Sequence, residues 1–240
     1  MSAAGIGWTF WLAPRPSTWR RPVVDEFWRF AQLAGPGALP TIAVAAVLVG
    51  GGLIGQAVFW LDRVGQTETL MRTIMLLLIR EVTPIVVGVV MLGRAGLANL
   101  AELGRMRADG TVRVLEAQGL DPLVLFVVPR VLALGLCTLV HAVFFLGLSI
   151  AVGHGIAQAL GVTTQDPFAL VRSTGRLIGE VGLFVLPVKT LLIGFAIGAV
   201  TATTALHQRV TADATVHLTS GFFRALLALV LVSIIGSLVL

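Results

Sequence analysis

Long runs almost free of charged residues limit the fold of this 240-residue chain more than any other feature of the sequence. A helix of about 20 apolar residues, rising about 1.5 Å per residue, crosses a hydrocarbon core roughly 30 Å thick. The runs assigned to such helices are residues 41–61, 73–93, 131–165, 183–206 and 225–240. We therefore predict an all-α integral membrane protein, with an N-terminal segment (1–40) followed by a five-span domain (41–240).

The composition agrees with this class of protein. Hydrophobic residues make up 57% of the chain and charged residues only 12%, and the mean hydropathy is +0.96. An ordinary globular domain has about half apolar and about a quarter charged residues. The net charge of +5 does not indicate a nucleic-acid partner, because the arginines are spread over loop ends rather than along one face.

The arginines instead predict the orientation of the chain in its membrane. If the N-terminus is cytoplasmic, most of the arginines fall on cytoplasmic segments and only four on the outer loops. This bias satisfies the positive-inside rule. Five spans that start from a cytoplasmic N-terminus then place Leu240 on the outer side.

The N-terminal segment is expected to stay attached, because its first apolar run precedes the arginines and no small-residue cleavage pattern follows. Within it, residues 23–34 form an amphipathic pattern. The apolar face is Val23, Phe27, Phe30 and Ala34, and the polar face is Asp25, Glu26, Arg29 and Gln32. Four of the five tryptophans lie before or within this pattern, and tryptophan favours the headgroup layer. We expect a helix in the membrane interface; the alternative is a soluble helix against a partner.

The sequence offers no constellation for catalysis, metal binding or ATP binding. Lys189, the only lysine, follows Val188, so no G-x-x-x-x-G-K-[ST] loop for phosphates exists. Cys137 is the only cysteine, and the four histidines show neither an i,i+4 pair nor an H-E-x-x-H pattern. No nucleophile with a base is recognised. We expect a transporter subunit rather than an enzyme, with no metal or cofactor and with ATP bound by a separate ATPase.

A charged segment, about residues 97–122, separates the second and third predicted spans. A permease that docks on a separate ATPase needs such a segment on its cytoplasmic side. Asp109 or Thr111 can cap the start of a short helix, Gly119 can form its left-handed C-terminal cap, and Pro122 can stop it. The alternative is a solvated loop that only connects the two spans.

Five short motifs follow one another between residues 80 and 133. They are RE-x-x-P at 80–84, GRAG at 93–96, AELG at 101–104, LEAQGLDP at 115–122 and VVPRVLA at 127–133. Their order and spacing resemble the MlaE/YrbE family, the permeases of Mla- and Mce-type lipid ABC transporters. The five spans and the interfacial helix extend this similarity to almost the whole chain.

The resemblance implies partners and a cargo. The charged segment would be the coupling helix that sits in a groove of the ATPase, with Arg105, Arg107, Asp109, Arg113 and Glu116 as coupling residues. Two permease chains, identical or related, would form the core in a bacterial inner membrane. A ring of MCE-domain proteins would cap the periplasmic side, and the cargo would be phospholipid or a related hydrophobic molecule.

Two other functions stay open. One is a non-transporting scaffold or assembly subunit, for instance the second half of a permease heterodimer. The other is a secondary transporter, although the paired, broken repeats typical of that class are not recognised in the sequence. Recovery of an ATPase and an MCE-type protein with the chain would favour the permease.

Among Asp, Glu, Lys and Arg, three residues interrupt the predicted spans: Arg80 and Glu81 in the second, and Lys189 in the fourth. An ionised group near the bilayer centre costs on the order of 2.5–3.5 kcal/mol, so such groups face a protein interior or a wet cavity. In one interpretation Glu81 only pairs with Lys189 or Arg80 and locks the helices together. In the other these residues line the lipid chamber, where one cation meets an anionic headgroup while Glu81 holds the other.

The sequence departs from the family pattern at several positions. Gly110 and Arg113 stand where the family commonly carries acidic residues, and Ser233 stands where an acid of the last span is expected. These changes predict a more basic coupling segment with a more flexible helix start, since glycine costs about 1 kcal/mol inside a helix. Elsewhere, small-x-x-x-small spacing predicts close helix contacts; the two pairs are Gly51 with Gly55 and Gly194 with Gly198.

Overall fold

The computed structural model describes residues 19–64, 73–161, 167–207 and 214–239, and every regular element in these ranges is helical. The elements, in which η marks a π-helical turn, are α2 (Arg21–Ala34), α3 (Leu39–Val64), η2 (Leu78–Val82), α5 (Thr83–Met91), η3 (Leu92–Gly96), α6 (Leu97–Ala108), α7 (Thr111–Ala117), η4 (Leu123–Val127), α8 (Val128–Ala159), α9 (Pro167–His207) and α10 (Ala214–Val239). The predicted all-α membrane fold is confirmed.

Four helices in the described ranges are long and apolar enough to cross a membrane. They are Thr73–Ala108, Leu123–Ala159, Phe184–His207 and Leu218–Val239. The count rises to five if α2 and α3, which are bent by 43° at their junction, are taken together as one broken span. Four of the five predicted spans overlap these four helices, whereas the first (41–61) is counted only as part of the bent pair. Several helices continue beyond the predicted ends.

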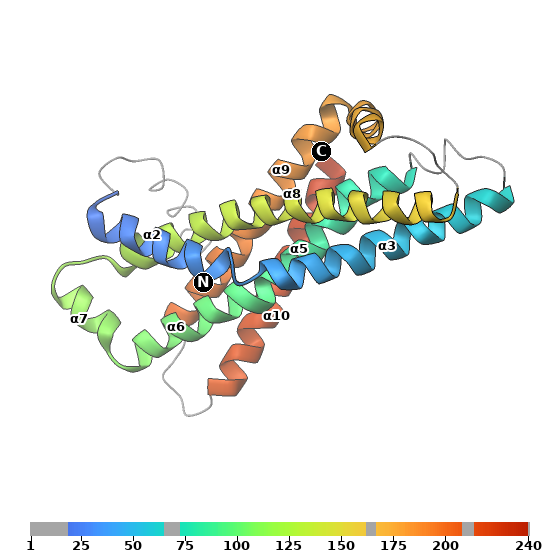
Figure 1. Ribbon diagram of the computed structural model, residues 1–240. Coiled ribbons are helices and arrows are strands. Elements are labelled where there is room, and N and C mark those ends of the chain that lie inside the picture. The colour runs from blue at the N-terminus through green and yellow to red at the C-terminus, as the bar shows by residue number, and fades with distance from the viewer. Residues whose placement is uncertain (1–18, 65–72, 162–166, 208–213, 240) are drawn as a thin grey trace.

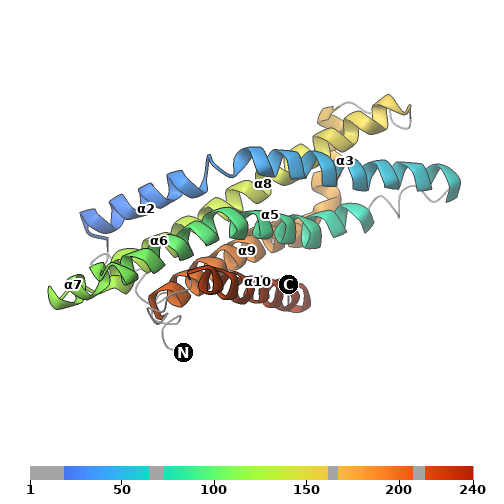
Figure 2. The same cartoon turned by 90° about the horizontal axis from the view of Figure 1, so that it is seen from below.

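The long helices form one bundle, in which α9 and α10 are inclined to α3 and α8 (Figures 1 and 2). α8 packs against α3 and α9, and α10 packs against α9. α2 and α6 lie together at one end of the bundle, and α7 forms the tip of that end (Figure 1). The second, smaller hydrophobic cluster is located there, where Leu103 of α6, Val112 of α7 and Val127 of η4 pack together.

Small residues bring α9 very close to α8. A β-carbon on Gly194 would lie 2.7 Å from the Cα atom of Gly135, and one on Gly198 would lie 2.9 Å from the Cα atom of Val131. The predicted close contacts of this glycine pair are confirmed. In α3 the closest approach is made by Gly50, whose β-carbon would lie 2.5 Å from the Cα atom of Ser149.

For the other predicted pair, Gly51 with Gly55, the structure describes the surroundings of Gly51 alone. A β-carbon on Gly51 would meet only the side chains of Ile156 and Val152, at 3.2 and 3.5 Å. Gly55 lies outside the residues whose surroundings the structure describes. Among the part of α3 whose side chains the structure describes, the tightest glycine contact therefore falls at Gly50, one residue before Gly51.

The structure corrects the predicted faces of α2. Val23, Phe30 and Ala34 are buried as predicted, but Glu26, assigned to the polar face, is also buried with 9% of its surface exposed. This face packs against α8 and η4 of the same chain, so protein rather than lipid covers it. Glu26 faces inward because its partner, Arg130, lies in α8, 104 residues away in the sequence.

Candidate functional site

The charged segment is the turn of a helical hairpin at one end of the bundle. The helix Thr73–Ala108 has 36 residues, so at about 1.5 Å per residue it is about 54 Å long and exceeds a hydrocarbon core of roughly 30 Å. Its polar last part, α6, therefore extends beyond the apolar region. We call α6, α7 and η4 together the charged hairpin (97–127).

The start of α7 differs from the prediction. The residue before α7 is Gly110, with φ of +77°, and no side chain caps the helix. Asp109 instead ends α6, and Thr111 is the first residue of α7. Gly110 thus lies between the helices in a left-handed conformation that glycine adopts without a β-carbon penalty. The predicted capping by Asp109 or Thr111 is wrong, and the expected cost of a glycine inside a helix does not arise.

The end of α7 agrees with the prediction. Gly119 has φ of +75°. The backbone N–H of Leu120 donates to the carbonyl oxygen of Leu115 at 3.0 Å, and that of Gly119 donates to Glu116 at 3.0 Å. This pair of hydrogen bonds is the Schellman motif, which satisfies the last carbonyl groups of a helix. Pro122 then stands directly before η4, so it begins the returning helix.

α7 has a buried and an exposed side. Val112 is 2% exposed and anchors α7 to the cluster below it. Arg113 and Glu116 are exposed together with Val114, which is 57% exposed. The tip of the hairpin therefore offers charged and apolar groups side by side, a combination suited to binding another protein.

The remaining predicted coupling residues lie on and after the last turn of α6. Arg105 and Asp109 form an ion pair of 3.6 Å, with 82% and 61% of their side chains exposed. Exposed pairs of this kind contribute little to stability. Arg107 is half-buried. The structure thus places all five predicted residues on the charged hairpin, four of them open to solvent.

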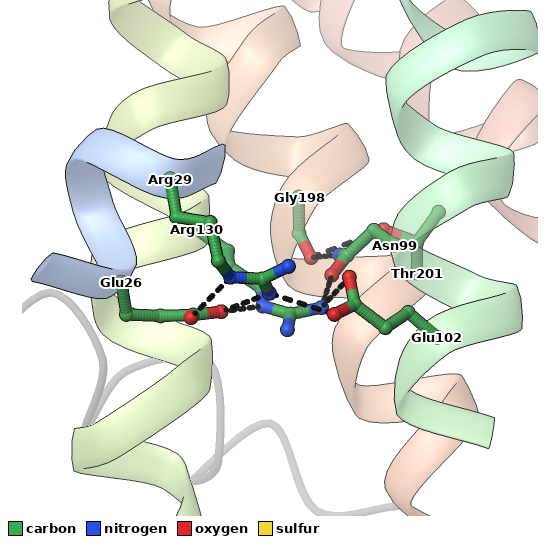
Figure 3. Close-up of polar contacts among 7 residues, drawn as sticks. All are labelled: Glu26, Arg29, Asn99, Glu102, Arg130, Gly198 and Thr201. Carbon is green, nitrogen blue, oxygen red and sulfur yellow. Dashed lines mark hydrogen bonds and ion pairs between the residues drawn. The ribbon is translucent and has the colours of Figure 1, made fainter. Parts of the chain in front are cut away.

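A closed ring of four charged residues lies at the base of the hairpin (Figure 3). The Glu26 carboxylate accepts hydrogen bonds from Arg29 Nε at 2.8 Å and from Arg130 Nε at 2.6 Å. The Glu102 carboxylate lies 2.7 Å from Arg29 Nη2 and 3.3 Å from Arg130 Nη1. Each carboxylate therefore bridges both arginines. We call these four residues the Arg–Glu ring.

The ring joins elements that are far apart in the sequence, and Arg130 is its centre. The Arg130 side chain is fully buried in the first turn of α8. Its guanidinium lies over the rings of Phe30 and Phe126, 5.4 and 5.7 Å from their centroids, as in cation–π contacts. Asn99 accepts a hydrogen bond from Arg130 Nη1 at 3.1 Å and donates to Thr201 Oγ1 of α9 at 2.9 Å. The ring thus connects α2, α6, α8 and α9.

The positive neighbours also control the ionisation of Glu26. Burial raises the pKa of this carboxyl group, but the hydrogen bonds and charges of Arg29 and Arg130 outweigh burial, so its pKa lies below the ordinary value. Glu26 therefore bridges the two arginines as a carboxylate at neutral pH. This ring was not predicted from the sequence. The available signal was Arg130, a lone arginine in the apolar surroundings of VVPRVLA.

The charged residues of the spans form a second polar site. Lys189 of α9 is fully buried, and its ammonium group donates to three acceptors. They are the Arg80 carbonyl oxygen at 2.7 Å, Glu81 Oε2 at 2.9 Å and Ser237 Oγ of α10 at 2.7 Å. An ammonium group has three donors, so all of them are used. We call Lys189, Glu81 and Ser237 the lysine cluster.

The backbone around Arg80 explains why its carbonyl group can accept Lys189. In an α-helix this carbonyl would accept the N–H of residue 84, but Pro84 has no N–H. The turn Leu78–Val82 is π-helical, and the Thr83 hydroxyl donates to the Leu78 carbonyl at 2.7 Å. The RE-x-x-P motif therefore exposes a carbonyl oxygen next to the Glu81 carboxylate, and both oxygens bind one ammonium group.

The two cations of the spans differ in their surroundings. The Arg80 side chain is half-buried and makes no hydrogen bond or ion pair with the other residues that the structure describes. The last span contributes Ser237, whereas the sequence pattern pointed to Ser233. The Ser233 side chain is buried, and its carbonyl oxygen lies 2.8 Å from the Ser237 hydroxyl.

Comparison with known proteins adds an independent observation. The chain matches the family model described as Permease MlaE over residues 27–239. A probable ABC transporter permease protein of Synechocystis is 29% identical over 170 residues, which are 70% of this chain and 63% of that protein. A probable ABC transporter permease protein of Rickettsia prowazekii is 25% identical over 163 residues, 68% of this chain and 62% of that protein.

A plant protein is similar over a shorter part of the chain. The chloroplastic protein trigalactosyldiacylglycerol 1 of Arabidopsis thaliana is 31% identical over 99 residues, which are 41% of this chain and 28% of that protein. The chain thus spans less than two thirds of the length of each of these three relatives.

Proposed function

This chain belongs to the MlaE permease family, and from that premise we propose that it is the membrane-spanning subunit of an ABC transporter that moves phospholipid or a related lipid. The multi-pass helical fold is that of a permease rather than an enzyme. The observation that carries the proposal is the charged hairpin, which extends beyond the apolar helices and ends in the exposed charges of α7.

A separate ATPase is the proposed partner of the hairpin. The chain has no phosphate-binding loop of the G-x-x-x-x-G-K-[ST] type, so a second chain must bind ATP. The relatives are probable ABC transporter permeases by name, which supports this partner. The centre of the proposed contact is the exposed side of α7, with Arg113, Val114 and Glu116. The buried Val112 packs the opposite side of α7 against the bundle, so this side faces solvent.

The further proposed partners are a second permease chain, identical or related, and an MCE-domain protein on the periplasmic side. A single chain of about five spans is small for a chamber that holds a lipid. The positive-inside distribution of arginine supports a cytoplasmic N-terminus and hairpin in a bacterial inner membrane. Native mass spectrometry of the intact complex, which counts the permease chains, tests the dimer: one permease per complex contradicts it.

The lipid cargo is supported by one relative and by the charges in the spans. The name of the Arabidopsis thaliana relative contains that of a galactolipid. Glu81 holds Lys189, whereas Arg80 lies nearby without a partner among the described residues. We therefore assign Arg80 as the cation that meets an anionic headgroup, with Lys189 as its structural neighbour.

The alternative proposal is a non-transporting scaffold subunit in a permease heterodimer. Arg113 and Gly110, which replace acidic residues of the family pattern, favour it because they change the charge of the hairpin. In that case the chain still binds the complex, but charge changes on its hairpin leave lipid-stimulated ATP hydrolysis unchanged. Measurement of hydrolysis in hairpin variants therefore separates the two functions.

Charge reversal tests the hairpin as the ATPase contact. In the variant Arg107→Glu, Arg113→Glu, Glu116→Lys, the ATPase should be lost on purification, or its hydrolysis should no longer respond to lipid. The control is Asp25→Lys, which reverses an exposed charge on α2, an element outside the hairpin, and should behave like the wild type. Unchanged ATPase recovery together with unchanged lipid-stimulated hydrolysis in the triple variant would disprove the contact.

A further inference from the structure

The Arg–Glu ring lies where the charged hairpin leaves the bundle. Glu102 is in α6, the outgoing arm, and Arg130 is in the first turn of α8, which continues the returning arm. Glu26 and Arg29 belong to α2, which is outside the hairpin. The ring therefore ties both arms of the hairpin to one another and to α2 at a single level of the structure (Figure 3).

The ring has a buried side and an exposed side. The side chains of Arg130 and Glu26 are 0% and 10% exposed, and those of Arg29 and Glu102 are 47% and 33% exposed. A buried charge that loses its partner is strongly destabilising, whereas an exposed pair contributes little to stability. Arg130 with Glu26 thus forms a permanent link between α8 and α2. Glu102 is the member that can be changed without leaving a fully buried charge alone.

The polar contacts continue from the ring into α9. Asn99 bridges Arg130 and Thr201, and α9 also carries Lys189, twelve residues before Thr201. At about 1.5 Å per residue, these two positions on one helix are about 18 Å apart. The base of the hairpin is therefore joined, through Asn99 and Thr201, to the helix that holds the lysine cluster.

We propose that the Arg–Glu ring positions the charged hairpin relative to α2 and α9, so that movement of α7 is passed to the spans as one rigid unit. Glu102 and Arg130 are positioning residues in this account, and neither touches the ATPase. This proposal rests on the proposed function in one respect, because the docked ATPase is what moves α7. The rigid link itself is a property of the single chain.

A distance measurement tests the link without any partner. Spin labels are placed on two exposed positions, Gln32 of α2 and Gln118 just after α7, in the full chain in lipid nanodiscs with Cys137→Ala. Glu102→Gln should broaden the distribution of label distances. Glu116→Gln makes the same chemical change on α7 outside the ring and should leave the distribution narrow. Equal distributions in the two variants would overturn the proposal.

The second readout is the number of lipids moved per ATP hydrolysed in the reconstituted complex. Glu102→Gln should keep the ATPase bound and lower this ratio about tenfold, the change expected when charge-assisted hydrogen bonds of the ring are lost. Arg29→Gln should have the same effect, and the double variant should add little, because both changes open the same ring. A normal ratio in Glu102→Gln, or fully additive effects, would contradict the ring as the link.

The two proposals fail in different ways. If the wild-type chain bound no ATPase, the proposed function would be wrong, but the label distances would still decide whether the ring fixes the hairpin. If the ATPase bound the wild type and both readouts were unchanged in Glu102→Gln, the proposed function would stand and the positioning role would be lost.

Discussion

The ammonium group of Lys189 has each of its donors occupied, whereas the guanidinium of Arg80 has no partner among the described residues. Pro84 contributes to this difference, because it removes the N–H that would otherwise occupy the Arg80 carbonyl oxygen. The sequence alone could not choose between the two cations. The choice depends on the contact of α9 with η2 and α10, and residue patterns within one helix do not encode that contact.

These surroundings predict opposite results for the two cations. Arg80→Gln should leave assembly intact and lower the affinity for an anionic lipid on the order of tenfold, since a hydrogen bond to a charged group contributes about 1.5–3 kcal/mol. Native mass spectrometry measures the preference for the anionic lipid by comparing the binding of phosphatidylglycerol with that of phosphatidylcholine. An unchanged preference in Arg80→Gln would remove Arg80 from the lipid site.

Lys189→Met is the matched control for Arg80→Gln, because it removes the other cation of the spans. We expect it to change the stability of the fold. The change leaves the Glu81 carboxylate without its cation, and it should lower the free energy of unfolding by about 2 kcal/mol. Adding Glu81→Gln should restore part of this loss, because the neutral amide does not require a cation. Thermal unfolding in detergent measures both effects. A fully stable Lys189→Met chain would mean that the cluster does not hold the helices together.

At the scale of the elements, the predictable features are those that depend on the local sequence. The left-handed Gly119 ends α7 as predicted, because that cap depends on a glycine next to the last helical turn. The polar face of α2 was assigned wrongly at Glu26, because Arg130 lies in another helix. The second span was predicted to end at residue 93, but helical hydrogen bonding continues to Ala108 beyond the apolar run.

The close contact between α8 and α9 gives a prediction at the same scale. In Gly194→Ala the new β-carbon would lie 2.7 Å from the Cα atom of Gly135, which is backbone and cannot turn away. Overpacking of this kind costs about 1–3 kcal/mol, and we expect a lower unfolding temperature in detergent. Gly147→Ala in α8 is the control, because a β-carbon there would have no atom within 4 Å beyond its chain neighbours and the backbone of its own helical turns. If both variants unfolded at the wild-type temperature, the glycine contact would not determine packing.

At the scale of the whole molecule, α9 connects the two polar sites of the described residues. α9 carries Lys189 of the lysine cluster and Thr201, which contacts the ring through Asn99. The apolar runs were enough to predict a membrane bundle, because crossing a bilayer imposes a requirement on each helix separately. The ring could not be predicted in that way, since its four residues come from α2, α6 and α8 and meet only after the helices pack.

The central claim is that α7 is the surface on which the ATPase docks, and site-specific photo-crosslinking in native membranes tests it most directly. A photo-reactive residue is placed at Val114, which is 57% exposed on α7, and in a second chain at Leu238, which is 82% exposed near the end of α10. We predict a covalent adduct with an ABC-type ATPase from position 114 and none from position 238. No ATPase adduct from position 114, or equal adducts from both positions, would contradict the account.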